Sequence, residues 1–197
     1  LSCLKQSTLA MIGTRKPSIT GAETAWRFAY ELAPHSVTIV SGLALGIDAA
    51  SHQGALNAKG YTIAVAGTGL DRVYPARHID LATEIVNTGA MVSEFPLGTP
   101  PARENFPRRN RLISGLSRGC LVIEAALASG SLITARLASE QGREVFAIPG
   151  SIHSPLSKGC HALIKQGAKL VESAQDVLEE FRLDTVSPNE PNSSGVT

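Results

Sequence analysis

Residues 101–111 combine the two kinds of side chain that hold a nucleic acid or another phosphate-rich ligand. Four of them are arginines: Arg103, Arg108, Arg109 and Arg111. The guanidinium group is a fork of donors that matches phosphate oxygens. Phe106, followed directly by a proline, offers a flat face on which a base can stack, a contact worth about 1–3 kcal/mol. The alternative is that Phe106 fills the core while the arginines pair with acidic residues near the C-terminus.

Glycine-rich turns that also carry hydroxyl groups follow three apolar runs. The first is Gly13-Thr14-Arg15, the second runs from Ser41 and Gly42 to Gly46, and the third is Ser129-Gly130-Ser131. Where such a turn leads into a helix, unpaired backbone N–H groups and the helix dipole bind anions. A single turn of this kind is explained as well by a tight bend, since glycine is the usual residue where φ must be positive. Three such turns at one sheet edge favour a ligand with several phosphates.

Asp48 and His52 lie four residues apart on one face of an expected helix, with Ser41 just upstream. A hydrolase is one interpretation, but the sequence has no Gly-x-Ser-x-Gly motif, and His52 can instead hydrogen-bond to Asp48 and orient the loop. Glu124 ends an apolar run and needs a partner, because an unpaired buried carboxylate is costly. We expect that partner to be an arginine of residues 108–111. Asp48, His52 and Glu124 are therefore expected to give structural support and not to catalyse a reaction.

Missing motifs disfavour other ligand classes. There is no P-loop, and Gly67-Thr68-Gly69 lacks the third glycine of a dinucleotide-binding turn. The five histidines form no set with metal-ligand spacing, and the three cysteines form no Cys-x-x-Cys pair. We therefore expect no metal, no cofactor and no disulfide, in a reducing, cytoplasmic setting.

The hydrophobic pattern alternates between strands and helices along the chain. It predicts strands at 8–12, 37–40, 61–65, 90–92, 120–123, 145–148 and 169–171. It predicts helices that follow Ser18 and Thr20 and at 47–58, 78–88, 108–115, 131–142, 159–166 and 174–182, with a proline-rich loop at 95–107. Near-continuous apolar strands separated by helices indicate an α/β, Rossmann-like doubly wound fold, with a mostly parallel sheet covered by helices on both faces.

The composition fits one globular domain. The chain has 197 residues, of which 43% are hydrophobic and 18% charged, and no apolar run is long enough to span a membrane. The net charge is +1, but residues 172–197 hold six acidic residues and one basic residue, so the remainder is basic. We expect a domain at 1–184 and a disordered tail or linker at 185–197, which is rich in Ser, Pro and Asn.

A series of motifs occurs in the order seen in one known family. They are Gly13-Thr-Arg, Ser41-Gly-Leu-Ala-Leu-Gly-Ile-Asp48 with His52, Tyr74-Pro75, Ser93-Glu-Phe-Pro96, the run from Asn105 to Ser117, Glu124-Ala, Ser129-Gly-Ser-Leu-Ile-Thr-Ala135, Gly142-Arg and Pro149-Gly150. Over residues 8–183 the chain closely resembles the DNA processing protein family called DprA or Smf.

The resemblance implies a Rossmann-like domain that binds single-stranded DNA and has no catalytic turnover. Members protect incoming DNA during natural transformation, help to load the recombinase RecA and typically form homodimers. It further implies that Arg15 contacts phosphate, that Arg103 makes a basic contact with DNA, that a base stacks on Phe106, and that Ser129 to Ser131 line the same pocket. The alternative is a nucleotide hydrolase of the phosphoribohydrolase type, although the Pro-Gly-Gly-x-Gly-Thr-x-x-Glu loop of such enzymes is missing.

Overall fold

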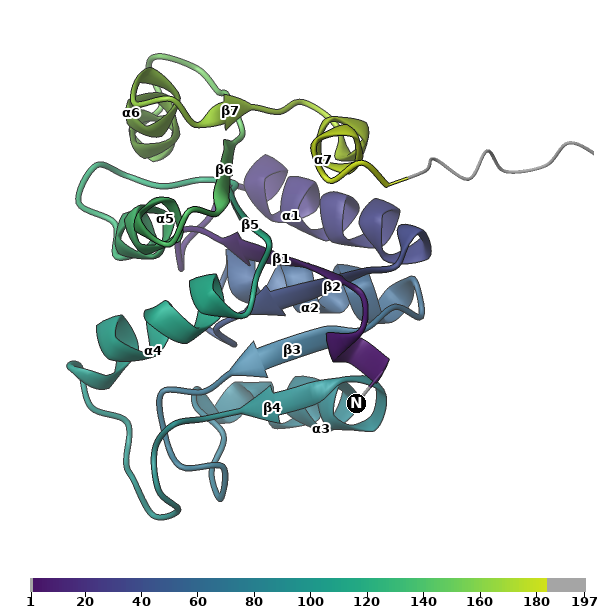
Figure 1. Cartoon of the computed structure of the whole chain (residues 1–197). Helices are drawn as coiled ribbons and strands as arrows, with labels where there is room; N and C mark the ends of the chain where they lie inside the picture. The colour runs from purple at the N-terminus through teal and green to yellow at the C-terminus, as the bar shows by residue number, and fades with distance from the viewer. Residues whose placement is uncertain (1, 184–197) are drawn as a thin grey trace, which may run out of the picture.

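Seven strands form one parallel sheet in the computed structural model, which describes residues 2–183 (Figure 1). The strands are β1 (Ser7–Ile12), β2 (Val37–Ser41), β3 (Thr62–Val65), β4 (Ala90–Val92), β5 (Gly119–Val122), β6 (Glu144–Ala147) and β7 (Lys169–Leu170). Their order across the sheet is β4-β3-β2-β1-β5-β6-β7. The predicted fold class is confirmed, whereas the expected tail at 185–197 lies outside the described residues.

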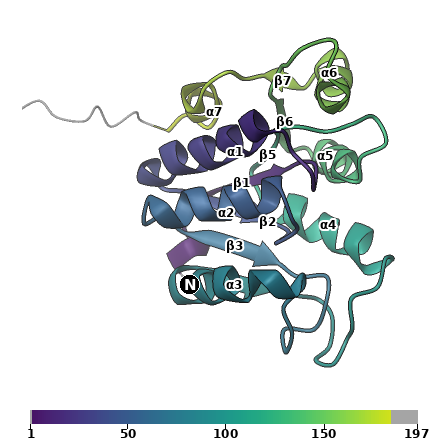
Figure 2. The ribbon, with the colours of Figure 1, turned by 180° about the vertical axis from the view of Figure 1, so that it is seen from behind.

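Helices cover both faces of the sheet, as Figures 1 and 2 show from opposite sides. They are α1 (Ile19–Leu32), α2 (Ile47–Asn57), α3 (Ile79–Thr88), α4 (Asn105–Gly115), α5 (Ser131–Glu140), α6 (Lys158–Lys165) and α7 (Ala174–Glu180). Helices α1, α2 and α7 pack on one face of the sheet, with α3 beside them, whereas α4, α5 and α6 pack on the other.

The alternation of side chains along each strand explains these two layers. Leu9 and Met11 of β1 pack into the cluster under α1 and α2, and Ala10 and Ile12 pack into the cluster on the opposite face. Every residue of β2, β3 and β5 is buried, as expected for strands covered on both sides.

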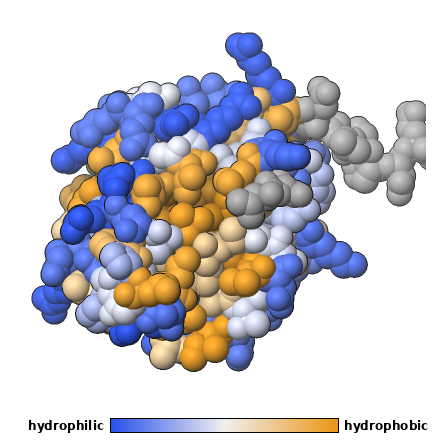
Figure 3. All heavy atoms as spheres, turned by 60° about the horizontal axis from the view of Figure 1, so that its bottom comes forward, coloured by the Kyte–Doolittle hydropathy of each residue, from blue (hydrophilic) through white to orange (hydrophobic). Residues whose placement is uncertain are grey.

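The helices cover the sheet less completely at its β4 edge. The three residues of β4 are only half-buried. Figure 3, in which the bottom of Figure 1 is turned toward the viewer, shows a band of hydrophobic side chains on the surface.

Among residues 2–183, no helix is long and apolar enough to cross a membrane.

The sheet order reverses between β1 and β5. The chain runs outward from β1 through β2, β3 and β4, then returns to pair β5 with the other side of β1. In open α/β sheets a ligand crevice forms at this switch point, outside the carboxyl ends of the strands. The topology therefore brings the turns after β1 and β5 to one place.

The predicted boundary between the proline-rich loop and the helix after it is wrong. The stretch 95–107 was expected to be a loop because of its prolines, but α4 begins at Asn105 and includes Phe106 and Pro107. A proline is tolerated in the first helical turn, where its missing N–H has no intrahelical partner in any case. Phe106 is consequently held on a helix.

Candidate nucleic-acid interface

A groove of about 830 Å³ lies at the switch point. The turn after β1, the first turns of α4 and the start of α5 form its walls. Of the predicted binding residues it is lined by Gly13, Thr14, Arg15, Arg103, Phe106, Arg109, Ser129, Gly130 and Ser131. The structure thus brings together residues that are more than a hundred positions apart in the sequence.

Positive charge predominates in this groove. In the described part of the chain, its lining includes four basic side chains, Arg15, Lys16, Arg103 and Arg109, against the single carboxylate of Asp48. Arg15, Lys16 and Arg103 are exposed, and within residues 2–183 none of them forms an ion pair with a carboxylate. These charges are therefore available to a polyanion.

Phe106 lines the groove and does not fill the core. Its ring is half-buried and packs against Gly67, where an added Cβ would lie only 2.9 Å from the ring edge. The guanidinium carbon of Arg15 lies 5.4 Å from the ring centre, and that of Arg109 lies 6.0 Å from it. An aromatic ring thus lies beside cationic groups, the combination that single-strand-binding grooves use.

Arg109 and Asp48 both line the groove, and each forms a hydrogen bond with the backbone of Gly42. The Gly42 N–H donates to the Asp48 carboxylate at 3.1 Å, and the Gly42 carbonyl accepts from Arg109 Nη1 at 2.7 Å. Arg109 Nη1 also donates to the Val65 carbonyl, so one side chain ties α4 to the ends of β2 and β3. Burial raises the pKa of Asp48, and the Arg109 guanidinium opposes that shift.

The loop after β2 packs against the turn after β1, which forms a wall of the groove. The buried Ser41 hydroxyl donates to the Met11 carbonyl at 2.6 Å, and Gly46 has a positive φ of 77° against the turn after β1. A Cβ at Gly42 would lie 2.6 Å from Arg109 Nη2, so a larger residue there would displace the guanidinium group. These three predicted residues do not line the groove.

Glu124 corrects an expectation. Its partner is not an arginine of 108–111 but Ser18, the N-cap of α1: the carboxylate accepts from the Ser18 hydroxyl at 2.6 Å and from the Ser18 N–H at 2.9 Å. A carboxylate at a helix N-terminus complements the helix dipole. The N-terminus of α1 therefore already holds an anion from the protein itself, and a phosphate cannot take the same place.

The N-terminus of α5 differs from that of α1, because none of the described carboxylates caps it. Its first turn holds no acidic residue, and its N-cap, Gly130, makes no side-chain capping hydrogen bond. The Ser129 and Ser131 hydroxyls lie 2.7 Å apart at the groove, and Thr134 follows on the same wall. Its backbone donors are largely used within the turn: the Ser131 N–H donates to the Ser129 hydroxyl at 3.3 Å, and the Leu132 and Ile133 N–H groups donate to the Ser129 and Gly130 carbonyls at 3.1 Å. This turn therefore offers a ligand mainly its two serine hydroxyls.

His52 does not orient the loop through Asp48 as expected. Its Nδ1 lies 2.6 Å from the Thr62 hydroxyl, and its buried Nε2 has no hydrogen-bond partner among the described residues. Burial lowers the pKa of His52 to about 3, and the nearby His78 and Arg109 act in the same direction. His52 is thus a neutral core residue.

Arg108 and Arg111 lie outside the groove lining. Arg111 pairs with Glu94, and the guanidinium carbon of Arg108 lies 5.7 Å from the centre of the Phe95 ring. Of the 108–111 cluster only Arg109 reaches the groove. The alternative, in which these arginines pair with C-terminal acids, is not seen in residues 2–183, where Glu180 pairs with Lys169.

Several lining residues were not proposed as binding residues from the sequence. They are Lys16, Tyr74, Asn110, Ile133 and Thr134. Lys16 follows Arg15 directly, and the other four stand in family motifs, so all of them carried a signal in the sequence.

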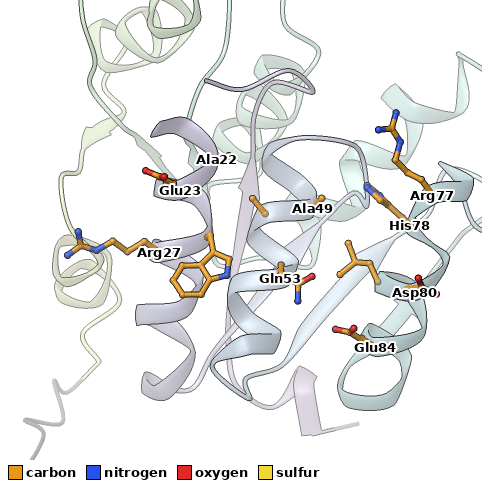
Figure 4. Close-up of a pocket in the computed structure, with 12 residues that line it drawn as sticks. Ala22, Glu23, Arg27, Ala49, Gln53, Arg77, His78, Asp80 and Glu84 are labelled. Carbon is orange, nitrogen blue, oxygen red and sulfur yellow. The ribbon is translucent and has the colours of Figure 1, made fainter. Parts of the chain in front are cut away.

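A second groove of about 830 Å³ lies between α1, α2 and α3 (Figure 4). Its charged side chains are Glu23, Asp80, Glu84, Arg27 and Arg77, so acidic groups outnumber basic ones. Trp26, Leu81 and alanines supply the apolar part. This surface does not suit a polyanion, which distinguishes it from the groove at the switch point.

The described part of the chain contains neither a cluster of metal-ligating residues nor a disulfide. No group of three or more His, Cys, Asp or Glu residues is placed there to hold a metal ion. The three cysteines are buried and unpaired, and burial raises the pKa of the Cys120 thiol to about 12 and that of Cys160 to about 11.

The fold and groove define a Rossmann-like α/β protein with a cationic groove at its switch point. The family model for DNA recombination-mediator protein A matches residues 1–182. The chain therefore belongs to this family, which confirms the resemblance to DprA and Smf proteins.

The relatives agree in sequence and in structure. Protein Smf of Escherichia coli K12 is 54% identical over 92% of this chain and 49% of its own length. The structure of DNA processing protein A from Streptococcus pneumoniae has a TM-score of 0.85 at 47% identity, over 93% of this chain and 64% of that one.

DNA processing protein A from Helicobacter pylori, whose structure describes a single-stranded DNA binding mode, has a TM-score of 0.84 at 31% identity over 91% of this chain and 82% of that one. This chain spans about half of the E. coli protein and just under two thirds of the S. pneumoniae one.

Proposed function

We propose that this protein binds single-stranded DNA in the groove at the switch point. The observation that carries the proposal is the joint presence, in one groove, of three exposed cationic side chains and the half-buried ring of Phe106. The cationic groups meet phosphates, the Ser129 and Ser131 hydroxyls at the start of α5 add hydrogen-bonding groups, and the ring takes an unpaired base. The single-stranded DNA binding mode of the H. pylori relative supports this assignment.

The preference for single strands follows from the aromatic ring. A base can stack on a side chain only when it has left its neighbours in the helix, and sequence-specific contacts are not needed for such stacking. Duplex DNA would meet the same cationic groups with its phosphates alone. Binding should therefore be stronger for a single strand of equal length, and it should weaken as salt rises because phosphate contacts release counterions.

We extend the proposal to the biological role of the family. In the cytoplasm the protein would process DNA during natural transformation, protect single strands and help to load RecA, as a homodimer. Membership of the DprA and Smf family supports this role.

We further propose that the protein acts without catalysis. Asp48, the one carboxylate that lines the groove among residues 2–183, already accepts hydrogen bonds from the Gly42 and Ala44 N–H groups at 3.1 and 3.2 Å. A carboxylate engaged in this way supports the loop. Incubation with nucleoside monophosphates should therefore release no free base, and release would favour the hydrolase alternative.

The proposal is tested by fluorescence anisotropy with a labelled oligo(dT) and with a duplex of equal length, each at several salt concentrations. We expect tighter binding of the single strand and an affinity that falls with salt. Equal affinity for both forms would contradict the stacking contact, and the absence of binding would overturn the function. Light scattering on the same sample measures whether the protein is a dimer.

A further inference from the structure

Tyr74 is a second aromatic side chain in the groove. It comes from the loop between β3 and the short 3-10 turn Ala76–His78, whereas Phe106 comes from the first turn of α4. The two ring centres are 5.6 Å apart and the ring planes are inclined by 35°. Two separate parts of the chain thus place two rings side by side at one ligand surface.

The two rings differ in how accessible they are. Phe106 is half-buried and has Gly67, Arg15 and Arg109 around it. Tyr74 is 46% exposed, which is high for a large side chain on a rigid surface. A base that reaches the groove therefore meets the open ring of Tyr74 without having to displace a guanidinium group.

The loop that carries Tyr74 is well anchored. The Ser93 hydroxyl donates to the Thr68 carbonyl at 2.6 Å, and the Gly69 N–H donates to the Thr99 carbonyl at 3.1 Å. Beyond Tyr74, His78 Nδ1 lies 2.9 Å from the Leu43 carbonyl oxygen. A ring held in place before binding costs little entropy to use, which favours its role as a contact.

We propose that Tyr74 and Phe106 form a two-ring platform on which two neighbouring bases of one DNA strand stack, one base on each ring. The proposal rests on the proposed single-strand binding and deepens it. The ring planes are inclined by 35°, so two bases stacked on them do not keep the parallel stack of a duplex, which repeats at about 3.4 Å.

The contact is made by the ring and not by its hydroxyl. Within residues 2–183, the Tyr74 hydroxyl makes no hydrogen bond that a phenylalanine would lose. Tyr74→Phe should therefore bind oligo(dT) as the original protein does. Tyr74→Ala should weaken binding about tenfold, within the range known for stacking on one base.

An abasic oligonucleotide of equal length separates stacking from phosphate contacts. On this strand, which has a deoxyribose-phosphate backbone but no bases, Tyr74→Ala should bind as well as the original protein. The matched control is Tyr30→Ala, because Tyr30 is 42% exposed but stacks on Trp26 of α1, outside the groove. It should leave both affinities unchanged. An equal loss on both strands would show that Tyr74 acts through the backbone or the fold, and would overturn the proposal.

Photo-cross-linking of the unaltered protein gives a second measurement that does not depend on a variant folding. Oligo(dT) with 5-iododeoxyuridine at one position per oligonucleotide is irradiated in the complex, which is then digested with trypsin. The peptide 73–77 carries Tyr74 and the peptide 104–108 carries Phe106. We expect cross-links to both peptides. Cross-linking to 104–108 alone would overturn the platform while leaving single-strand binding intact, and a failure of oligo(dT) to bind at all would instead overturn the proposed function.

Discussion

The Glu124 carboxylate accepts a hydrogen bond of 2.6 Å from the Ser18 hydroxyl, although the two residues are 106 positions apart. Glu124 follows β5, and Ser18 is the N-cap of α1, so the contact joins the two sides of the switch point. An added Cβ at Gly21 would lie 2.3 Å from the same carboxyl group, which shows how tightly the helix start closes around it. The anion site at α1 is thus an internal one.

The first prediction concerns this contact. Glu124→Gln keeps an oxygen acceptor but removes the charge from the helix N-terminus. We expect the free energy of unfolding to fall by about 1–2 kcal/mol, because a charged acceptor at a partly buried helix start is worth about this much. Urea unfolding measures it, and Glu23→Gln on the exposed side of α1 is the control. Equal stability of the two variants would show that the charge of Glu124 is not used.

The second prediction concerns the buried Arg109. Arg109→Ala leaves Asp48 without its nearest cation and two carbonyl groups without a donor. We expect a loss of about 3–5 kcal/mol in the free energy of unfolding, typical of an uncompensated buried charge. Arg108→Ala, next in the chain but exposed, should change stability by less than about 0.5 kcal/mol. Similar unfolding midpoints for both would contradict a structural role of Arg109.

The third prediction concerns Arg15 as a phosphate contact. Arg15→Ala should reduce the slope of log affinity against log salt by about 0.7, the value for one contact on a single strand. Anisotropy titrations with oligo(dT) at four salt concentrations give this slope. Arg27→Ala is the matched control, because Arg27 is an exposed arginine on α1 that pairs with Glu31. An unchanged slope for Arg15→Ala would place this side chain away from the DNA backbone.

The fourth prediction concerns Phe106, whose removal should change the affinity but not its salt dependence. Phe106→Ala removes a stacking surface but no charge, so the affinity for oligo(dT) should fall by about 1–3 kcal/mol while the salt slope stays the same. Phe106→Tyr, which keeps the aromatic face, should retain most of the binding. A change in slope as large as that of Arg15→Ala would mean that the ring acts by placing Arg15.

The fifth prediction is a pH dependence that arises from His52. In the folded protein the pKa of His52 is lowered to about 3, whereas in the unfolded chain it is about 6.5. Between these values the unfolded state binds a proton that the folded state does not. Stability is therefore complete above pH 6.5 and falls as the pH drops, by about 2 kcal/mol at pH 5.

Comparison with His52→Asn isolates this effect, because the contribution of Asp48 is common to both proteins and cancels. Unfolding free energies at pH 7.5, 6.5, 5.5 and 5 should fall less steeply for the variant. His153→Asn, at an exposed histidine, should keep the slope of the original protein. Parallel curves for His52→Asn and the original protein would show that His52 is not the group that titrates.

The elements were largely predictable from the sequence. All seven strands and the parallel sheet were predicted, because apolar runs of this length and composition have few alternatives. The start of α4 was misplaced because prolines suggest loops, and only the helix itself shows that Pro107 lies in the first turn.

The roles within the candidate site were less predictable. Three arginines between 108 and 111 look equivalent in the sequence, yet Arg109 is buried against Gly42 and Val65 while Arg108 and Arg111 stay outside the groove. Which of them is buried depends on the carbonyl groups at the ends of β2 and β3. No local pattern near Arg109 encodes those distant carbonyl groups.

By itself, the sequence determined the order of strands and helices, the family, and a basic segment with an aromatic residue, because periodicity, motifs and charge are local properties. The tertiary structure alone decided that Glu124 occupies the start of α1, that Arg109 is structural, and that Tyr74 lies beside Phe106. Each of these outcomes is a contact between segments far apart in the chain, and burial at such contacts sets which polar groups are already satisfied and which remain for a ligand.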